Sequence, residues 1–312
     1  MSFEFEKPLE EIETRISELT ALKETKPQVQ AEIDKLTARL NDERKAIYSR
    51  LSAWETVQVA RHPERPSLRD YIAHLFKDFV ELHGDRAFGD DQAIIGGFAT
   101  LFKHRVLIIG HQKGKSVEEN IKFNFGMARP EGYRKALRLM KMAEKFSLPV
   151  ISFIDTSGAF PGLDAEERGQ AEAIARNLRD MSRLAIPILV VVTGEGGSGG
   201  ALGIGVGDRI LMLSNSVYSV ISPEGCASIL WRDGSKAPEA AEALKITAPA
   251  LLKLKIIDEI IPEPAGGAHR NMMETMKAVR KSLLKHLAVL KGTGIKKLLE
   301  RRYEKLANIG RF

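Results

Sequence analysis

The sequence has 312 residues, of which 44% are hydrophobic and 28% charged, and this balance excludes a largely disordered chain. Lys and Arg number 47 against 41 Asp and Glu, a formal net charge of +6, and the single cysteine, Cys226, excludes an internal disulfide and a cysteine-rich zinc site. No apolar run approaches the ~20 residues of a membrane-spanning helix, and the acidic start lacks the features of a signal peptide, so we expect a cytoplasmic protein without membrane contact.

The N-terminal segment 1–60 is predicted to form a helical hairpin. Apolar residues from Leu9 to Leu22 recur every three or four positions, Pro27 interrupts the pattern, and a similar spacing runs from Val29 to Trp54. Such an extension has little core of its own, so we expect it to pack on the body or on another subunit. The domains expected are a helical extension at 1–60, a body at 61–270 and a basic helical tail at 271–312.

The body is predicted to alternate apolar strands with helices. Pro149 opens the strand 150–155 and Pro187 opens the strand 188–193, and a threonine and a glycine-containing turn accompany the end of each. Between them a helix is expected to begin at Asp164, with Glu167 completing a capping box. Repetition of this kind is typical of an α/β fold built from similar units. Further strands are expected at 93–102, 106–109, 209–213, 218–222 and 256–261.

The positive charge of the chain is concentrated in the tail. The segment 271–312 holds 11 Lys and Arg against three acids, whereas the segment 1–270 holds 36 Lys and Arg against 38 Asp and Glu. A solvated helix face explains such a tail, and a surface for an acidic partner is the alternative. Aromatic residues that could stack on bases are nearly absent from it, which argues against nucleic-acid binding.

The glycine-rich segment 194–201 matches three motifs. The spacing of Gly194, Gly196 and Gly199 fits a dinucleotide-binding fingerprint, but the next strand ends in Ser-Asn-Ser instead of the acidic residue that would hold a ribose. The spacing around Ser198 fits a nucleophile elbow, with Asp258 and His269 following in hydrolase order. A five-glycine segment meets that pattern easily, so a serine hydrolase remains an alternative.

The third interpretation uses only the backbone. Glycines at the start of a helix allow N–H groups to approach a ligand oxygen closely, which makes an oxyanion hole suited to a thioester enolate. The turn at Gly158 and Ala159 is expected to supply a second set of donors on the same side. The alternative is that these glycines serve only tight packing.

Six long motifs carry a resemblance to a known family. They closely resemble the carboxyltransferase α subunit of bacterial acetyl-CoA carboxylase, and the similarity runs over nearly the whole chain. In that family the turn after the strand 150–155 usually reads IDTPGA, whereas Ser157 stands here in place of the proline. The motifs are IGHQKG at 109–114, PEGYRKALRL at 130–139, FIDTSGAFPG at 153–162, GEGGSGGALGIGVGD at 194–208, YSVISPEGCASILW at 218–231 and IIPEPAGGAHRN at 260–271.

The resemblance implies a crotonase-like α/β fold, a spiral of ββα units. It also implies an α₂β₂ enzyme whose β subunit carries a zinc ribbon, so that no metal is bound by this chain. The implied reaction transfers the carboxyl group from carboxybiotin, held on the biotin carboxyl carrier protein, to acetyl-CoA, and the malonyl-CoA formed serves fatty acid biosynthesis. Biotin carboxylase would be a further partner. The family's oxyanion hole maps to Gly199 and Gly200, with substrate-binding positions at Gly158, Ala159, Gly196, Gly197 and Ser198.

That chemistry does not require a catalytic triad. Loss of CO₂ from carboxybiotin leaves negative charge on its ureido oxygen, which backbone donors can stabilise, and the released nitrogen can take the proton from the acetyl group. His111, Glu195 and His269 are then candidates for positioning roles. The alternatives are a crotonase-type acyl-CoA hydratase, a serine hydrolase using Ser198, and a binding module that acts through the tail.

Overall fold

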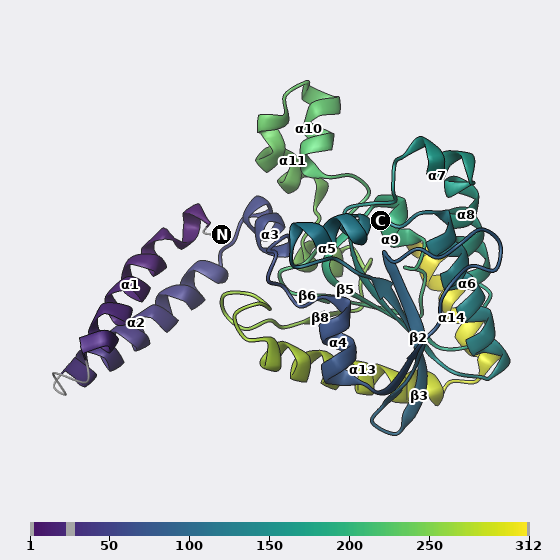
Figure 1. The fold of residues 1–312 in the computed structure, drawn as a ribbon, viewed down its shortest axis with the longest axis horizontal. Helices are drawn as coiled ribbons and strands as arrows, with labels where there is room; N and C mark the ends of the chain where they lie inside the picture. The colour runs from purple at the N-terminus through teal and green to yellow at the C-terminus, as the bar shows by residue number, and fades with distance from the viewer. Residues whose placement is uncertain (1–2, 23–28, 311–312) are drawn as a thin grey trace.

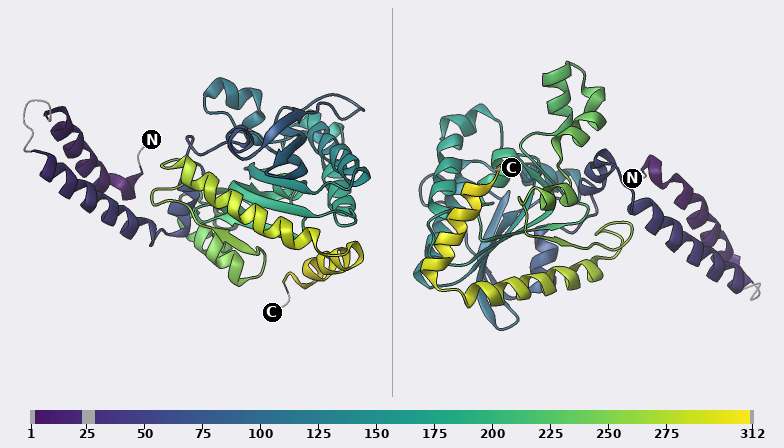
Figure 2. Two further views of the ribbon diagram at one scale, coloured as in Figure 1. Left: turned by 90° about the horizontal axis from the view of Figure 1, so that it is seen from below. Right: turned by 180° about the vertical axis from the view of Figure 1, so that it is seen from behind.

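In a computed structural model, which describes residues 3–22 and 29–310, the N-terminal segment is a helical arm. A short 3₁₀ turn, η1 (Glu4–Glu6), leads into α1 (Lys7–Leu22), which packs against α2 (Gln30–Tyr48). The hairpin projects away from the body, as Figures 1 and 2 show. Its buried side chains are few, with Leu9, Ile12 and Leu40 at their centre. Pro27 lies outside the described residues.

The remaining elements build the body and the tail. Two helices, α3 (Ala53–Ala60) and α4 (Leu68–Leu75), precede the first strand in the sequence, and α5 (Val117–Lys122) follows the third. The other helices are α6 (Pro130–Lys145), α7 (Leu163–Glu167), α8 (Gln170–Met181), α9 (Ser198–Leu202), α10 (Pro223–Trp231), α11 (Ala237–Leu244), α12 (Ala248–Lys253), α13 (Met272–Lys291) and α14 (Ile295–Asn308). The strands are β1 (Lys77–Glu81), β2 (Ile94–Leu101), β3 (His104–His111), β4 (Val150–Thr156), β5 (Ile188–Gly197), β6 (Arg209–Leu213), β7 (Val217–Ser219) and β8 (Glu259–Ile261).

The strands form one mixed sheet. Its order is β1-β2-β3-β4-β5-β6-β8, with β7 paired to the far end of β5. The β1–β2 and β2–β3 pairs are antiparallel, and the remaining pairs, from β3 to β8, are parallel. This mixed α/β architecture confirms the fold class expected from the sequence.

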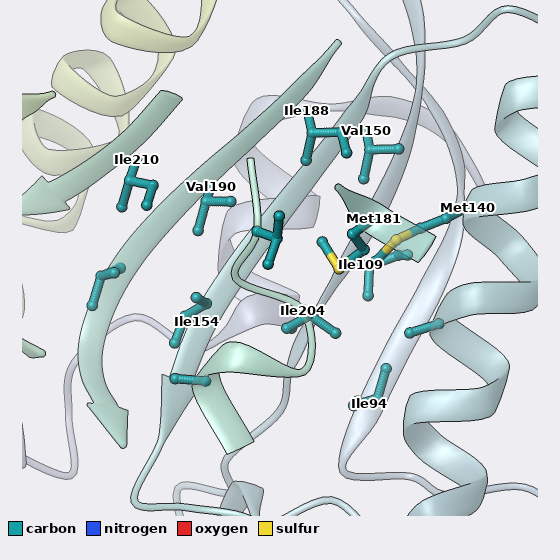
Figure 3. Close-up of a cluster of buried hydrophobic side chains, with 14 of the residues drawn as sticks. Ile94, Ile109, Met140, Val150, Ile154, Met181, Ile188, Val190, Ile204 and Ile210 are labelled. Atoms are coloured by element: carbon teal, nitrogen blue, oxygen red, sulfur yellow. The ribbon is translucent and has the colours of Figure 1, made fainter. Parts of the chain in front are cut away.

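Both faces of the sheet are covered, because neighbouring residues on a strand point to opposite sides. One face carries Ile109, Val150 and Ile188, which pack with α6 and α8 in the core shown in Figure 3. The other face carries Ile151 and Leu189 and packs against α4 and α13. Strands buried on both faces explain why their sequences read as continuous apolar runs.

The repeat seen in the sequence corresponds to the pairing of the two central strands, β4 and β5. Val150 of β4 lies opposite Ile188 of β5, and the same offset holds for Ile154 and Val192. The helix expected from Asp164 is interrupted, however. Gly169 adopts φ 81°, which ends α7 and starts α8 as a separate helix, and the cap of α7 is Gly162 instead of Asp164. The capping-box prediction was therefore wrong.

The basic tail lies along the body. Arg302 of α14 is almost fully buried and donates five hydrogen bonds, to both carboxylate oxygens of Asp208 and to the carbonyls of Met181, Leu184 and Ile186. Lys305 pairs with Asp258. Part of the positive charge of the tail therefore balances acidic groups of the body. Among the described helices none has the length and apolar character that crossing a membrane requires.

Candidate active site

The glycine-rich segment continues strand β5 and then turns sharply. The strand runs through Gly197, where the sequence had suggested a turn from Gly194 onward. Ser198 then adopts φ 49°, a left-handed conformation that L residues enter at a cost of about 1–2 kcal/mol, and opens the five-residue helix α9. This change of direction at the carboxyl end of a parallel strand turns the backbone of Gly199 and Gly200 back toward the neighbouring strand β4.

The two glycine turns touch each other through their backbones. A Cβ at Gly200 would lie 2.3 Å from the carbonyl carbon of Gly158 and 2.6 Å from the nitrogen of Ala159. A Cβ at Gly197 would lie 2.2 Å from the carbonyl oxygen of Ser157. Only glycine fits at either position, so the structure brings the two predicted turns together on one edge of the sheet.

The other predicted positions have different surroundings. A Cβ at Gly196 would meet the ring of Tyr218 at 2.5 Å, whereas one at Gly199 would make an ordinary 3.5 Å contact with Ile174. The N–H of Gly158 already donates to the hydroxyl of Thr156 at 3.2 Å. Close packing therefore explains why residue 196 is a glycine. At Gly199 a side chain would fit, so packing does not explain that glycine.

A cavity of about 270 Å³ lies beside the turns, and its lining is strongly charged. Arg61 donates to Glu195 at 2.7 Å and also pairs with Glu224 on α10. Lys113 lies 2.7 Å from Asp155 and 3.5 Å from Glu195. Burial alone would lower the pKa of Lys113, but the two carboxylates outweigh it and raise that pKa. Lys113 therefore carries its proton at neutral pH.

The segment between arm and body is anchored in the same place. Arg65 forms a bidentate pair with Glu263 and donates to the carbonyl of Thr193, just before the glycine segment. The side chains of Arg65 and Glu263 are 3% and 0% exposed, so this is a fully desolvated ion pair. Loss of one partner would leave the other charged and buried, which is strongly destabilising.

The three side chains considered for positioning roles, those of His111, Glu195 and His269, have different environments. His111 ends β3 and is almost fully buried, and burial lowers its pKa to about 4, so its ring is neutral at pH 7. Glu195 joins Arg61 and Lys113 in the charged cavity. The ring of His269 stacks on that of His62, with 3.9 Å between centroids.

These positions do not form a hydrolase triad. The carboxylate of Asp258 binds Arg209, Lys305 and the N–H of Ile210, and His269 faces His62. In the described part of the chain, no hydrogen bond joins Ser198 to either residue. The nucleophile-elbow match is therefore a consequence of glycine content.

Lys113 and Asp155 lie within two of the motifs that carry the family resemblance, but neither was predicted to be a site residue. Both lie at the carboxyl ends of neighbouring parallel strands, where side chains converge at one sheet edge, and that placement was the available signal. Arg61 gave no such signal, because it reaches the site from the segment after α3. Across residues 3–22 and 29–310, no group of three or more His, Cys, Asp or Glu is arranged to hold a metal ion.

Comparison with known proteins decides the family. Residues 2–310 match the family described as acetyl co-enzyme A carboxylase carboxyltransferase-like. The chain belongs to this family. The acetyl-coenzyme A carboxylase carboxyl transferase subunit alpha of Geobacter metallireducens is 57% identical over 309 residues, covering 99% of this chain and 97% of its own length. The corresponding subunit of Vibrio cholerae is 55% identical, with 98% of each chain covered.

Solved structures show the same fold at low sequence identity. A transcarboxylase 12S structure matches with a TM-score of 0.59 at 20% identity, over 76% of this chain and 45% of that chain. A Pseudomonas malonate decarboxylase hetero-tetramer matches with a TM-score of 0.56 at 16% identity, over 71% and 89% of the two chains. The protein is therefore an α subunit of an acetyl-CoA carboxylase carboxyltransferase with a crotonase-like fold, and the comparisons do not favour the hydratase and hydrolase alternatives.

Proposed function

We propose that this chain supplies one half of a shared active site, in which a zinc-ribbon β subunit supplies the other half. The complete site would transfer the carboxyl group of carboxybiotin, presented on the biotin carboxyl carrier protein, to acetyl-CoA and form malonyl-CoA. Biotin carboxylase would regenerate carboxybiotin elsewhere in the same cytoplasmic complex. The observation that carries the proposal is the backbone contact between the turns at Gly158 and Gly200.

The proposed role of Gly199 and Gly200 is to hold negative charge. Their N–H groups belong to the first turn of α9, which has no intrahelical acceptors for them. Carboxybiotin supplies the carboxyl group. As that group leaves, negative charge grows on the ureido oxygen of biotin. Donors that are already in place when charge develops favour the transition state over the ground state. Because α9 has only five residues, we assign this effect to the individual N–H groups and not to a helix dipole.

The neighbouring backbone is proposed to bind the substrate around this point. The walls of the substrate site would be formed by Gly158 and Ala159 on one turn and by Gly196, Gly197 and Ser198 on the other. The N–H of Gly158 is taken by Thr156, whereas the N–H of Ala159 has no acceptor in the part of the chain that the structure describes. Ala159 is therefore the donor that this second turn would offer.

An exposed apolar surface at the end of α10 supports a partner subunit. On α10, Ile229 and Leu230 are 71% and 66% exposed, and Trp231 is also exposed. The start of α10 at Pro223 shares a small cavity with Gly196 and Gly197, so the helix that carries this surface begins next to the site. Figure 1 shows α10 and α11 standing clear of the sheet. Exposed groups of large apolar residues are typical of protein interfaces.

The three segments are proposed to divide this work. Residues 61–270 would form the carboxyltransferase domain, and the extension at 1–60 and the tail at 271–312 would serve assembly and stability. The arm contacts the body through Arg270, which lies 3.6 Å from both Glu6 and Glu13. The length of arm that projects beyond this contact is consistent with a second contact surface in the assembled enzyme.

Copurification with the β subunit tests the assembly. We expect a one-to-one complex in which zinc accompanies the partner. Leu230→Asp should abolish the complex, because it places a charge in the proposed interface, and it should leave the fold intact because the side chain is exposed. Phe102→Asp, at a similarly exposed position in the turn between β2 and β3, is the matched control and should copurify normally. Normal assembly of Leu230→Asp would contradict the proposed interface.

A further inference from the structure

One carboxylate joins two of the elements that form the site. Asp155 lies near the end of β4, and its Oδ1 accepts from the backbone N–H of Glu195 at 3.0 Å and from Lys113 at 2.7 Å. A carboxylate oxygen has two lone pairs and can accept both bonds at once. Its side chain is 15% exposed, so water competes little with these contacts. Asp155 therefore links β4 directly to the backbone of the glycine segment on β5.

This link lies at an irregularity in the β4–β5 pairing. Ile154 pairs with Val192, but the next recorded pair is Thr156 with Gly196. Over this interval, therefore, β5 contains two more residues than β4. A Cβ at Gly194 would lie 2.5 Å from Asp155 Oδ1, so the carboxylate occupies the space that a side chain at residue 194 would need. Bulges of this kind redirect a strand and often lie next to active sites.

The position of the oxyanion turn depends on this irregularity. Directly after it, Gly196 pairs with Thr156, Gly197 abuts Ser157, and Gly200 abuts Gly158. A different register at residues 193–195 would move all of these contacts along the strand. The N–H groups of Gly199 and Gly200 would then point to a different place.

We propose that Asp155 is a positioning residue for carboxyl transfer, which fixes the register of β5 and so places the donors of Gly199 and Gly200. Lys113 balances its charge and ties it to Glu195, which Arg61 holds from the other side. Asp155 acts through the backbone and need not touch the substrate. This inference rests on the proposed function of the two glycines.

The test measures transfer by the complete complex with β subunit and biotin carrier. Asp155→Ala removes both hydrogen bonds, and Asp155→Asn keeps an oxygen that can accept from Glu195 while removing the charge. Asp180 offers a matched control, because its side chain is 14% exposed and pairs with Lys141 at 2.8 Å on the outer helices. Asp180→Ala removes a similar ion pair far from the turns.

We expect Asp155→Ala to lower kcat by about 100-fold with KM for acetyl-CoA nearly unchanged, since a misplacement of about 1 Å costs that much. Asp155→Asn should show a smaller loss of kcat, and Asp180→Ala none. A purely structural role predicts lower thermal stability with normal kcat per folded complex, and that result would overturn the proposal.

The remaining outcomes of this test also support or overturn the proposal. An increase in KM alone would overturn the proposal, because it would assign Asp155 to substrate binding. If Asp155→Ala does not assemble, Asp155→Asn decides by the same criterion: a lower kcat at unchanged KM supports the proposal, and a wild-type kcat overturns it. Failure of the wild-type complex to form malonyl-CoA would instead contradict the proposed function.

Discussion

Gly200 and Gly158 lie so close that a single methyl group cannot be placed between them. The Cβ of any side chain at Gly200 would be 2.3 Å from the carbonyl carbon of Gly158 and 2.5 Å from its oxygen, distances that atoms in proteins do not adopt. The glycine requirement is thus set by the neighbouring turn. From the sequence, this glycine was explained by the close approach of its N–H group to a ligand oxygen, whereas the structure shows that a side chain here would collide with the protein itself.

Substitution at Gly200 should therefore damage both the fold and the reaction. We expect Gly200→Ala to lower the free energy of unfolding by about 1–3 kcal/mol, as overpacking does, and to abolish transfer by separating the two turns. In Gly199→Ala the new Cβ makes a 3.5 Å contact with Ile174, so the melting temperature should not fall. Thermal unfolding of both variants checks this, and equal melting temperatures would contradict it.

Ser198 should matter through its backbone and not through its hydroxyl. We expect Ser198→Ala to keep substantial transfer activity, and Ser198→Gly to raise the free energy of unfolding by about 1 kcal/mol, because glycine adopts φ 49° without strain. Steady-state transfer assays and urea unfolding measure the two effects. Loss of all turnover in a normally folded Ser198→Ala complex would restore the nucleophile interpretation.

The tail should be required for stability through one buried arginine. Arg302→Leu leaves Asp208 charged and three carbonyls without their donor, and we expect a loss of about 3–5 kcal/mol in the free energy of unfolding. Arg301→Leu makes the same change of charge at the preceding, exposed position and should cost little. Urea unfolding compares the two. Similar losses for both would mean that charge, and not burial, connects the tail to the body.

The stacked pair of His62 and His269 should make stability fall in mild acid. Burial chiefly, with the neighbouring positive groups, lowers the pKa of His269 to about 3, whereas an unfolded histidine titrates near 6.5. Between these values the unfolded chain binds a proton that the folded chain does not, so stability decreases as pH falls below 6.5. His269→Phe keeps a ring against His62 and removes this titration.

Urea unfolding at pH 7.5 and pH 5 measures that dependence. We expect the difference in unfolding free energy between the two pH values to shrink in His269→Phe by on the order of 1 kcal/mol. His62→Phe should change it in the same direction, because burial also lowers the pKa of His62. An unchanged pH dependence in both variants would show that the pair does not titrate as its environment requires.

The central strands were predictable because their pattern is local. Pro149 and Pro187 predicted two equivalent strands, and those strands are neighbours whose register has the same offset as the prolines. Strand β1 was missed, since Lys77–Glu81 contains two acids and a lysine and lies at the edge of the sheet, where burial imposes no apolar pattern. Gly169 was missed as a break because glycine inside a helical pattern does not always end a helix.

The glycines of the site and Glu195 were visible in the sequence, but the charged groups that Glu195 meets were not. Arg61, Lys113, Asp155 and Glu195 lie on four separate segments and meet only when the sheet is formed. In the same way, the pairing of Arg302 with Asp208 spans 94 positions. Contacts of this kind depend on side-chain packing across the fold, for which a single sequence contains no periodic signal.

Reconstitution of carboxyl transfer tests the account most directly. The purified chain is mixed with carboxylated biotin carrier and acetyl-CoA, with and without the β subunit, and malonyl-CoA is measured. The account predicts no product from the chain alone, product from the complete mixture, and none when the complete mixture contains the Gly200→Ala chain. Malonyl-CoA formed by this chain in the absence of the β subunit would contradict the shared site.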